Sequence, residues 1–402
     1  MKRSWLRLGG PLLALVFLAV AAGPDEQRLQ GLCLTALDVG QGDALLLEFP
    51  EGDPWLVDGG GIPGSRYDVG LQRVLPALRR RGIDRLGLVV MTHGDADHAG
   101  GLTAVLEHLE VERLLVPRRT RLGALERSVL SLAKDRGVRV MTASHPEALP
   151  SAPPGIRARV LHPGPGPEQG SSNDGSVVLH LGYGAVAMIL TGDIEEAGEG
   201  ALLAAHRDVG AQILKVAHHG SRTSSTPAFL DAVNPLVAVA GVGANNRFGF
   251  PHLGVTTRLR ARGADLFTTA GRGEVQICTD GVSIEVQGRK SDRWEMLQRV
   301  GAERIAQWTS PVRAAAAPKG EGIGSSQSVS RPFGVGTRTR RGGGGRSQRK
   351  RTKSLAGARK SSSGGRRASE EPTPPPSILS DKEWERSRRD RRKPKPPWSS
   401  RR

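Results

Sequence analysis

The feature that most restricts the fold of this chain is a cluster of two histidines and two carboxylates within six positions, HGDADH at residues 93–98. The cluster directly follows an apolar run at residues 86–91, which predicts a buried strand. Imidazole nitrogens and carboxylate oxygens delivered by the end of one strand can converge on a divalent cation such as Zn²⁺ or Mn²⁺. The cluster therefore predicts a metal site at the edge of a sheet. Its candidate ligands are His93, Asp95, Asp97 and His98.

Three further apolar runs also end in polar side chains. Asp58 follows the first, and its carboxylate predicts either a partner that orients a metal-bound histidine or a simple turn former. Asp193 follows the second, and a carboxylate there could bridge two cations. The third run leads to His218 and His219. Because neighbouring side chains on a regular strand point in opposite directions, we expect at most one of these two histidines to be a ligand.

The order of the predicted elements favours an α/β layered fold. Short strands and glycine-rich turns alternate with amphipathic helices from residue 32 to residue 286, the pattern of sheets covered by helices. Helices are predicted over residues 67–81, 102–109, 122–136, 194–206 and 256–262. Two hairpins are predicted, one from residues 177–180 and 185–190 and the other from residues 273–278 and 282–286. One amphipathic helix is predicted over residues 294–308.

The two cysteines, Cys33 and Cys278, are too few for a disulfide-stapled scaffold. The core must therefore come from apolar packing. Each cysteine stands in an apolar, strand-like segment, which favours two buried thiols, and a single bridge between them stays open.

The net charge of +18 belongs to the C-terminal part of the chain. Residues 311–402 hold 25 Lys and Arg and 7 Asp and Glu, whereas residues 1–310 hold 33 of each sign. Because residues 310–402 have almost no apolar periodicity, they predict a disordered polybasic tail. Two roles are open for this tail: an electrostatic tether to nucleic acid, anionic lipid or wall polymer, and a solubilising extension without a partner.

The N-terminus has the composition of a targeting segment. Lys2, Arg3 and Arg7 precede an apolar stretch at residues 8–23 that contains small side chains. This pattern predicts a secretory signal peptide or a short membrane anchor over residues 1–23, and the alternative is a buried N-terminal helix. A signal or an anchor would place the rest of the chain outside the cytoplasm, whether secreted, periplasmic or held at the inner membrane.

Together, these motifs resemble those of the metallo-β-lactamase fold superfamily, and within it those of the extracytoplasmic hydrolase domain of ComEC-type DNA-uptake proteins. An aspartate at position 95, where the superfamily more often has a second histidine, and Asp43 after Gly-Gln-Gly are marks of this branch. The matching segments, in the family's order, are LDVGQGDA at 37–44, LVDGG at 56–60, THGDADH at 92–98, NDGS at 173–176, LTGD at 190–193, KVAHHGS at 215–221 and PH at 251–252.

The resemblance implies a four-layer αβ/βα sandwich over residues 32–290, with a site for two divalent ions, Zn²⁺ or Mn²⁺, at one edge between the sheets. His93 and Asp95 would hold one ion, Asp97 and His98 would hold the other, and Asp193 would lie between the ions. The implied metal ligands are His93, Asp95, Asp97, His98, Asp193, His218 or His219, and His252. The implied catalytic residues are Asp97, Asp58 and Lys215, and the implied substrate contacts are Asn173, Ser176, Ser221 and Asp43.

The same resemblance implies a metal-dependent phosphodiesterase or nuclease that cuts DNA outside the cytoplasm during competence-type DNA uptake. Two alternatives stay open: hydrolysis of a small-molecule ester, lactam or phosphoester on this fold, and DNA binding through the basic tail without catalysis. The family has a multi-helix membrane channel domain ahead of the hydrolase, whereas here one apolar segment precedes residue 32. Two explanations stay open. The protein is either a free-standing hydrolase with a separate channel partner or a truncated gene product.

Overall fold

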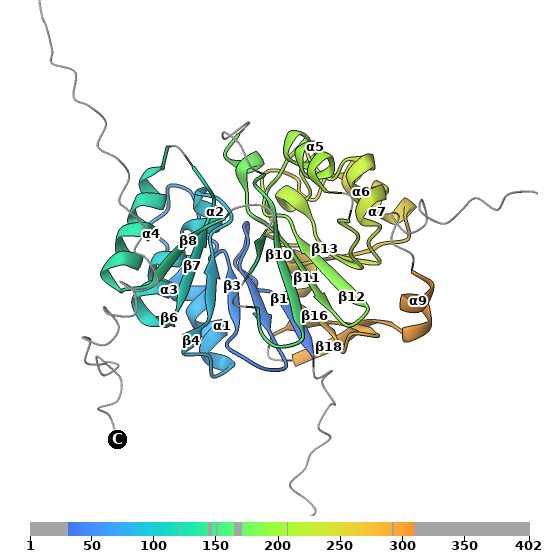
Figure 1. Cartoon of the computed structure of the whole chain (residues 1–402), viewed down its shortest axis with the longest axis horizontal. Coiled ribbons are helices and arrows are strands. Elements are labelled where there is room, and N and C mark those ends of the chain that lie inside the picture. The colour runs from blue at the N-terminus through green and yellow to red at the C-terminus, as the bar shows by residue number, and fades with distance from the viewer. Residues whose placement is uncertain are drawn as a thin grey trace, which may run out of the picture. The chain divides into compact units, whose positions relative to one another are not determined.

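The computed structural model describes residues 31–119, 121–143, 147–149, 152–164, 171–206, 208–291 and 293–308. Within these residues, two β-sheets pack face to face, and helices cover the outer face of each sheet (Figure 1). This arrangement confirms the predicted four-layer αβ/βα sandwich. The predicted signal or anchor at residues 1–23 and the predicted tail at residues 310–402 lie outside the described residues. None of the helices in the described ranges has the length and apolar character that a membrane crossing requires.

The first sheet has the strand order β18-β17-β16-β1-β2-β3-β5-β7-β8. The strands from β18 to β3 in this order pair antiparallel, and those from β3 to β8 pair parallel. Their bounds are Leu32–Ala36 (β1), Leu45–Glu48 (β2), Trp55–Val57 (β3), Leu88–Val90 (β5), Arg113–Val116 (β7), Arg139–Thr142 (β8), Glu274–Thr279 (β16), Ile284–Lys290 (β17) and Arg293–Val300 (β18).

The second sheet has the strand order β15-β14-β13-β12-β11-β10-β9. Strands β9 to β12 pair antiparallel and β12 to β15 parallel, and both predicted hairpins are confirmed, as β11–β12 here and β16–β17 in the first sheet. The bounds are Glu147–Ala148 (β9), Ile156–His162 (β10), Val178–Tyr183 (β11), Val186–Leu190 (β12), Ile213–Lys215 (β13), Val237–Ala240 (β14) and Asp265–Thr268 (β15). A separate parallel pair joins β4 (Arg85–Leu86) and β6 (Glu110–Val111).

Helices α1, α3 and α4 lie on the first sheet, and α5, α6 and α7 on the second (Figure 1). The predicted helix at 67–81 starts later than expected, with a π-helical turn at Gly70–Val74 that leads into α1. The helices are α1 (Leu75–Arg80), α2 (Ala96–Ala99), α3 (Leu102–His108), α4 (Ala124–Asp135), α5 (Glu196–Ala205), α6 (Pro227–Val233), α7 (Leu253–Ala261), α8 (Thr269–Arg272) and α9 (Ala302–Gln307).

Apolar side chains fill all three spaces between the four layers. Between the sheets, residues such as Val57 and Val90 of the first sheet share one buried cluster with Leu179 and Met188 of the second. Separate clusters lie under α1, α3 and α4 and under α5, α6 and α7. Because helices cover the outer face of the first sheet and the second sheet covers its inner face, β5 is buried at every position. This explains the continuous apolar run of β5.

The single helix predicted over residues 294–308 is wrong. The structure has the edge strand β18 followed by the short helix α9. Strand β17 offers an unpaired edge to β18. The two strands pair antiparallel, from Lys290 opposite Arg293 to Ile284 opposite Val300. Long-range pairing of this kind overrides a local helical pattern, because strand preference depends mostly on packing against neighbouring strands.

The interpretation of the cysteines as buried thiols is also wrong, because Cys33 and Cys278 form a disulfide bond. The two residues are direct partners in the pairing of β1 with β16. They are separated by 245 residues in the sequence, and nothing local in the sequence indicates that these two strands become neighbours.

We expect the Cys33→Ser, Cys278→Ser double variant to unfold at a lower urea concentration than the natural chain. A bridge that closes so long a loop restricts the unfolded chain, and its loss costs about 2–5 kcal/mol. Urea titrations with and without dithiothreitol measure the effect: the reductant should shift only the natural chain. Equal midpoints for the natural chain in both conditions would show that the bridge does not stabilise the fold.

Candidate metal centre

Four strands end at one edge of the sandwich, and the segments after them meet there. β3 and β5 are parallel neighbours in the first sheet, and β12 and β13 in the second. The short helix α2, which contains the end of the HGDADH motif, lies at this edge between the sheets (Figure 1). The residues brought together are Asp58 after β3, His93, Asp95, Asp97 and His98 after β5, Asp193 after β12, and Lys215, His218 and His219 from β13 and the turn that follows.

Two glycines allow this close meeting of loops. A side chain at Gly61 would collide with the carbonyl oxygen of Ala96, and one at Gly42 would collide with that of Asp97. The loops after β1 and β3 therefore lie with their backbones directly against α2. This contact places Asp43 and Asp58 beneath the histidines of the motif.

Asp58 orients His98. Its carboxylate accepts hydrogen bonds from the Thr92 backbone N–H at 2.8 Å and the Thr92 hydroxyl at 2.7 Å, and it contacts His98 Nδ1 at 2.8 Å. Asp58 is buried and has a left-handed backbone with φ of 61°. Because the Nδ1–H group donates to the carboxylate, the His98 Nε2 atom is left to face the centre of the site.

Asp43 has the corresponding position behind His219. Its Oδ1 atom lies 3.5 Å from His219 Nδ1, and its Oδ2 atom is ion-paired with the ammonium group of Lys215. Lys215 is fully buried and donates to the carbonyl oxygen of Gly192 at 3.2 Å. The structure thus places Asp43 and Lys215 beneath the site and away from solvent, whereas the sequence predicted a substrate contact and a catalytic role for them.

His98, His219 and Asp193 form a triangle of ligand atoms. The two Nε2 atoms are 3.2 Å apart, and they lie 3.1 Å (His98) and 3.3 Å (His219) from Asp193 Oδ2. A tetrahedral Zn²⁺ ion with bonds of about 2.0–2.1 Å spaces its ligand atoms about 3.3 Å apart. The buried group formed by these three residues and Asp43 could therefore hold a metal ion, with Asp43 on the Nδ1 side of the rings.

The charges around the triangle attract a cation. Burial alone would lower the pKa of both His98 and His219. The charges of Asp193 and Asp58 instead raise the pKa of His98 well above its ordinary value. The charges of Asp193 and Asp43 do the same for His219. Burial opposes ionisation of Asp193, yet His219 and His98 hold its pKa well below the usual range. If both rings were protonated, two N–H groups would face each other at 3.2 Å, and one divalent ion bound to both lone pairs removes that conflict.

His93 presents a second nitrogen that is ready to bind a metal. The Thr92 hydroxyl has one hydrogen, which goes to Asp58, so it must accept the hydrogen of His93 Nδ1 at 3.0 Å. Burial first, and the charge of His98 second, lower the pKa of His93 to about 3, which keeps the ring neutral. Its Nε2 atom is buried and has no hydrogen-bond partner among the described residues, as expected for a ligand.

Asp95 and Asp97 lie on the solvent side of the centre. Asp97 Oδ2 is 3.5 Å from His219 Nε2, and the Asp97 side chain is 24% exposed. Burial opposes its charge, but the hydrogen bond with His219 and the charge of His98 lower the pKa of Asp97. Asp95 is half exposed, with Oδ2 3.9 Å from His93 Nε2. These two carboxylates mark the face from which a substrate would approach.

His218 and His219 lie in a tight 3₁₀ turn (Ala217–Gly220) and not on a regular strand, but His219 alone of the two joins the group of residues that could hold a metal ion. Their φ angles are 46° and 53°, which turns both rings toward the site. His219 joins the triangle, while His218 Nε2 lies 3.9 Å from Asp193 Oδ2 and its Nδ1 contacts Glu195 at 3.2 Å. The His252 ring lies 5.5 Å from that of Phe250, whose ring lies 5.7 Å from that of His218.

The remaining predicted substrate contacts lie beside the centre. Ser176 is fully buried, and its hydroxyl accepts from the backbone N–H of Asp193 at 3.2 Å, so it supports that residue. Ser221 is buried and bonded to Thr223 at 2.8 Å. Asn173 is half-buried in a 3₁₀ turn (Asn173–Gly175). Of these three, Asn173 is the most accessible to a substrate.

Sequence reasoning gave no role to two residues that shape the centre. Thr92 bonds both Asp58 and His93, although its place just before the motif was a usable signal. Glu195 contacts His218 and accepts from the Thr223 hydroxyl at 2.6 Å. Its only signal is its place two residues after Asp193, which is too weak to separate it from an ordinary helix-start carboxylate.

We expect Lys215→Met to lower the free energy of unfolding by about 3–5 kcal/mol, because it leaves Asp43 buried without its partner. The Lys215→Met, Asp43→Asn double variant should recover part of that loss. Urea denaturation of the chelator-treated protein measures both effects. If Lys215→Met matches the natural chain, the buried pair does not hold this loop in place.

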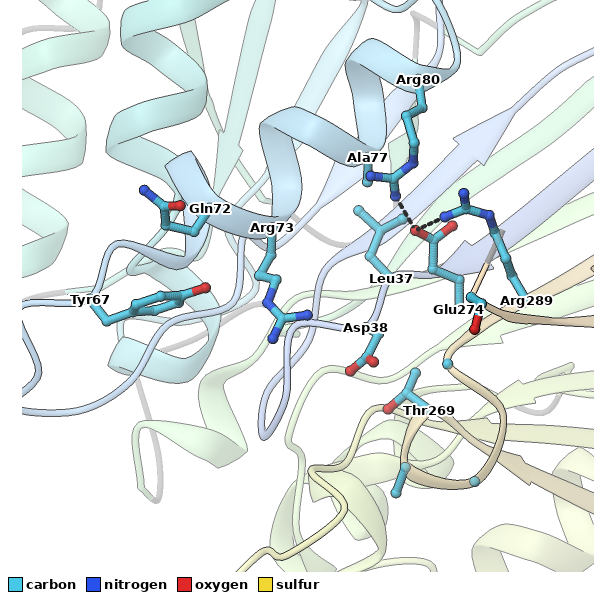
Figure 2. Close-up of a pocket in the computed structure, with 14 residues that line it drawn as sticks. Leu37, Asp38, Tyr67, Gln72, Arg73, Ala77, Arg80, Thr269, Glu274 and Arg289 are labelled. Carbon is cyan, nitrogen blue, oxygen red and sulfur yellow. Dashed lines mark hydrogen bonds and ion pairs between the residues drawn. The ribbon is translucent and has the colours of Figure 1, made fainter. Parts of the chain in front are cut away.

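A second concave region lies beside the loop that leads to Asp43. Figure 2 shows this hollow of about 650 Å³, in which Arg80 and Arg289 both reach Glu274, at 2.6 and 3.4 Å. Arg73 extends into the hollow between Tyr67 and Asp38, and no dashed contact joins it to the residues drawn. Three guanidinium groups against two carboxylates favour an anionic occupant.

A model of one protein family, the metallo-beta-lactamase superfamily, matches residues 37–243. The chain is 30% identical over 251 residues to ComE operon protein 3 of Bacillus subtilis and 29% identical over 270 residues to competence protein ComA of Neisseria gonorrhoeae. These matches cover 60% and 64% of this chain and 32% and 34% of the two relatives. The chain thus spans about a third of the length of these curated relatives.

Two solved structures are also similar to this chain. One is a diphosphatase from the PhnP family, with 17% identity, a TM-score of 0.35, and coverage of 58% of this chain and 94% of that one. The other is Igni18, a metallo hydrolase from Ignicoccus hospitalis, with 14% identity, a TM-score of 0.37, and coverage of 61% and 98%.

Proposed function

Because the chain belongs to the metallo-beta-lactamase superfamily, we propose that it is a metal-dependent phosphodiesterase that cuts DNA outside the cytoplasm. The observation that carries this proposal is the triangle of His98, Asp193 and His219, whose spacing fits a tetrahedral ion. When bound, a divalent ion lowers the pKa of water from about 15.7 to about 7 and so supplies a nucleophile at neutral pH.

In this proposal the site would take two ions, Zn²⁺ or Mn²⁺. His98, His219 and Asp193, with Asp97 at their side, would hold the first. His93 Nε2 and Asp95 would hold the second. A carboxylate in place of a nitrogen ligand makes the second position harder and moves its preference toward Mn²⁺. Asp43, Asp58 and Lys215 orient the ligands.

DNA as the substrate is supported by the relatives, since one of them is named competence protein ComA and competence is the uptake of DNA. The cationic hollow of Figure 2 adds a place where a phosphate of a longer chain can bind. A small-molecule phosphoester or lactam stays the second candidate, because one fold hosts many chemistries.

One observation favours a place outside the cytoplasm. The Cys33–Cys278 bridge is of a kind that persists in oxidising compartments. Residues 1–23 then act as a signal peptide or anchor, residues 32–290 as the hydrolase domain, and residues 310–402 as a tether to DNA. A membrane channel protein is the proposed partner, since DNA cut outside must still enter the cell.

The test compares three substrates with the full chain: plasmid or single-stranded DNA, a chromogenic phosphodiester and a chromogenic β-lactam. Protein stripped of metal receives Mn²⁺ or Zn²⁺, and we expect metal-dependent cleavage of DNA and of the phosphodiester. Cleavage of the β-lactam alone would select the small-molecule alternative. Binding of DNA without cleavage under any metal would select the binding protein.

A further inference from the structure

A row of planar side chains runs from the metal centre out to the surface. The Phe250 ring lies 6.4 Å from the His219 ring at 28° and 5.7 Å from the His218 ring. The Phe248 ring stacks on Phe250 at 5.3 Å and 19°. The Arg247 guanidinium lies 5.1 Å from the centre of the Phe248 ring. The row therefore joins His219, a ligand of the proposed metal, to an exposed arginine.

The loop that carries this row is held in a defined shape. The Asn246 side chain accepts from the Phe250 backbone N–H at 2.8 Å and donates to the carbonyl oxygens of Gly243 and Phe250 at 3.0 and 2.9 Å. The backbone N–H of His252 donates to the carbonyl oxygen of Gly220, in the turn that carries His219, at 2.9 Å. These bonds tie the loop to the metal centre and fix the aromatic rings beside it.

Phe248 is 48% exposed on a chain with seven phenylalanines. A lone exposed apolar residue needs no explanation. Phe248, however, is not isolated, because it stacks on Phe250 and the Arg247 guanidinium lies over its ring. Such a combination of an aromatic face and a cation binds nucleic-acid strands, since the ring stacks on a base and the cation meets the phosphate.

We propose that Phe248, backed by Phe250 and Arg247, is a stacking subsite for one unpaired base of a DNA strand whose backbone reaches the metal centre. This inference rests on the proposed function and adds a substrate class, the single strand. Bases within a duplex already stack on each other, whereas an unpaired base has a free face. Every base has such a face, so the subsite tolerates any sequence.

The test measures binding of the full chain in chelator, so that no cleavage occurs. Fluorescence anisotropy compares a short single-stranded oligonucleotide with an abasic strand of the same length, at about 200 mM salt to weaken phosphate contacts, including those of the basic tail. We expect the natural chain to bind the intact strand about 5- to 100-fold more tightly than the abasic one, and Phe248→Ala to lose that preference.

Three variants sharpen the result. Phe248→Trp should keep the preference for the intact strand. Leu253→Ala, which removes an apolar side chain that is 79% exposed nearby, should leave it unchanged. Arg247→Ala should weaken binding of both strands and reduce the salt slope by about one phosphate contact.

A natural chain that does not distinguish the strands, or a Phe248→Ala variant that still does, would overturn the subsite. Failure of the proposed function gives another result. The natural chain then still binds the intact strand more tightly than the abasic one, but it does not cut DNA with any metal.

Discussion

Replacing Asp193 with asparagine is expected to remove metal binding and, with it, hydrolysis. Asp193 Oδ2 lies within 3.3 Å of the Nε2 atoms of both His98 and His219, so it closes the triangle of ligands and supplies its negative charge. Loss of an outer hydrogen-bond partner alone costs about 10–100-fold, and loss of this ligand should therefore lower the cleavage rate by more than about 100-fold. Asparagine keeps the size of the side chain and limits damage to packing.

Metal content after dialysis and the initial rate of phosphodiester cleavage measure this effect. Asp208→Asn serves as the matched control, because its side chain is 69% exposed and its contact with the Arg159 guanidinium is long, at 3.9 Å. The control should match the natural chain in both measurements. An Asp193→Asn variant that retains full metal content and rate would show that the triangle is not the metal centre.

Replacing Asp58 with asparagine separates the two interpretations of that residue. Asparagine adopts a left-handed backbone as readily as aspartate, so a turn former with φ of 61° would tolerate the change. A partner that orients His98 would not, because the new NH₂ group faces donors in either orientation of the amide. In the Oδ1 position it meets the Thr92 backbone N–H, and in the Oδ2 position it meets the Thr92 hydroxyl and His98 Nδ1. We expect metal affinity and activity to fall by about 10–100-fold, with the fold retained.

Titration of the stripped protein with Zn²⁺ or Mn²⁺ gives the affinity, and far-UV circular dichroism gives the fold. Thr92→Val should shift the affinity in the same direction, because it removes the hydroxyl that bonds both Asp58 and His93. Unchanged affinity in Asp58→Asn would return Asp58 to the role of a turn former.

Much of this site follows from sequence because each part of it comes directly after an apolar strand. The carboxyl ends of β3, β5, β12 and β13 bring Asp58, the HGDADH motif, Asp193 and the histidine pair together, and local patterning finds such strands. The order of strands and helices predicted an α/β layered fold, and the family resemblance of the motifs implied its four layers.

The parts that sequence missed depend on long-range pairing or on backbone shape. The Cys33–Cys278 bridge requires β1 to lie beside β16, and the edge strand β18 forms only because β17 offers it an edge. Left-handed φ angles at His218 and His219 show that these residues do not continue the strand, so the alternation of side chains along a strand does not apply to them. The role of Asp43 behind His219 could not be predicted, because it depends on the close approach of two glycine loops.

The measurement that tests the central claim most directly is metal-dependent cleavage of DNA by the full chain and by its Asp97→Ala, His98→Ala double variant. The protein is stripped with chelator and supplied with Mn²⁺ or Zn²⁺, and the DNA is followed on a gel over time. We predict cleavage that requires the added metal in the natural chain and none above background in the double variant. Equal cleavage by both proteins would contradict a metal-dependent hydrolase built on the HGDADH motif.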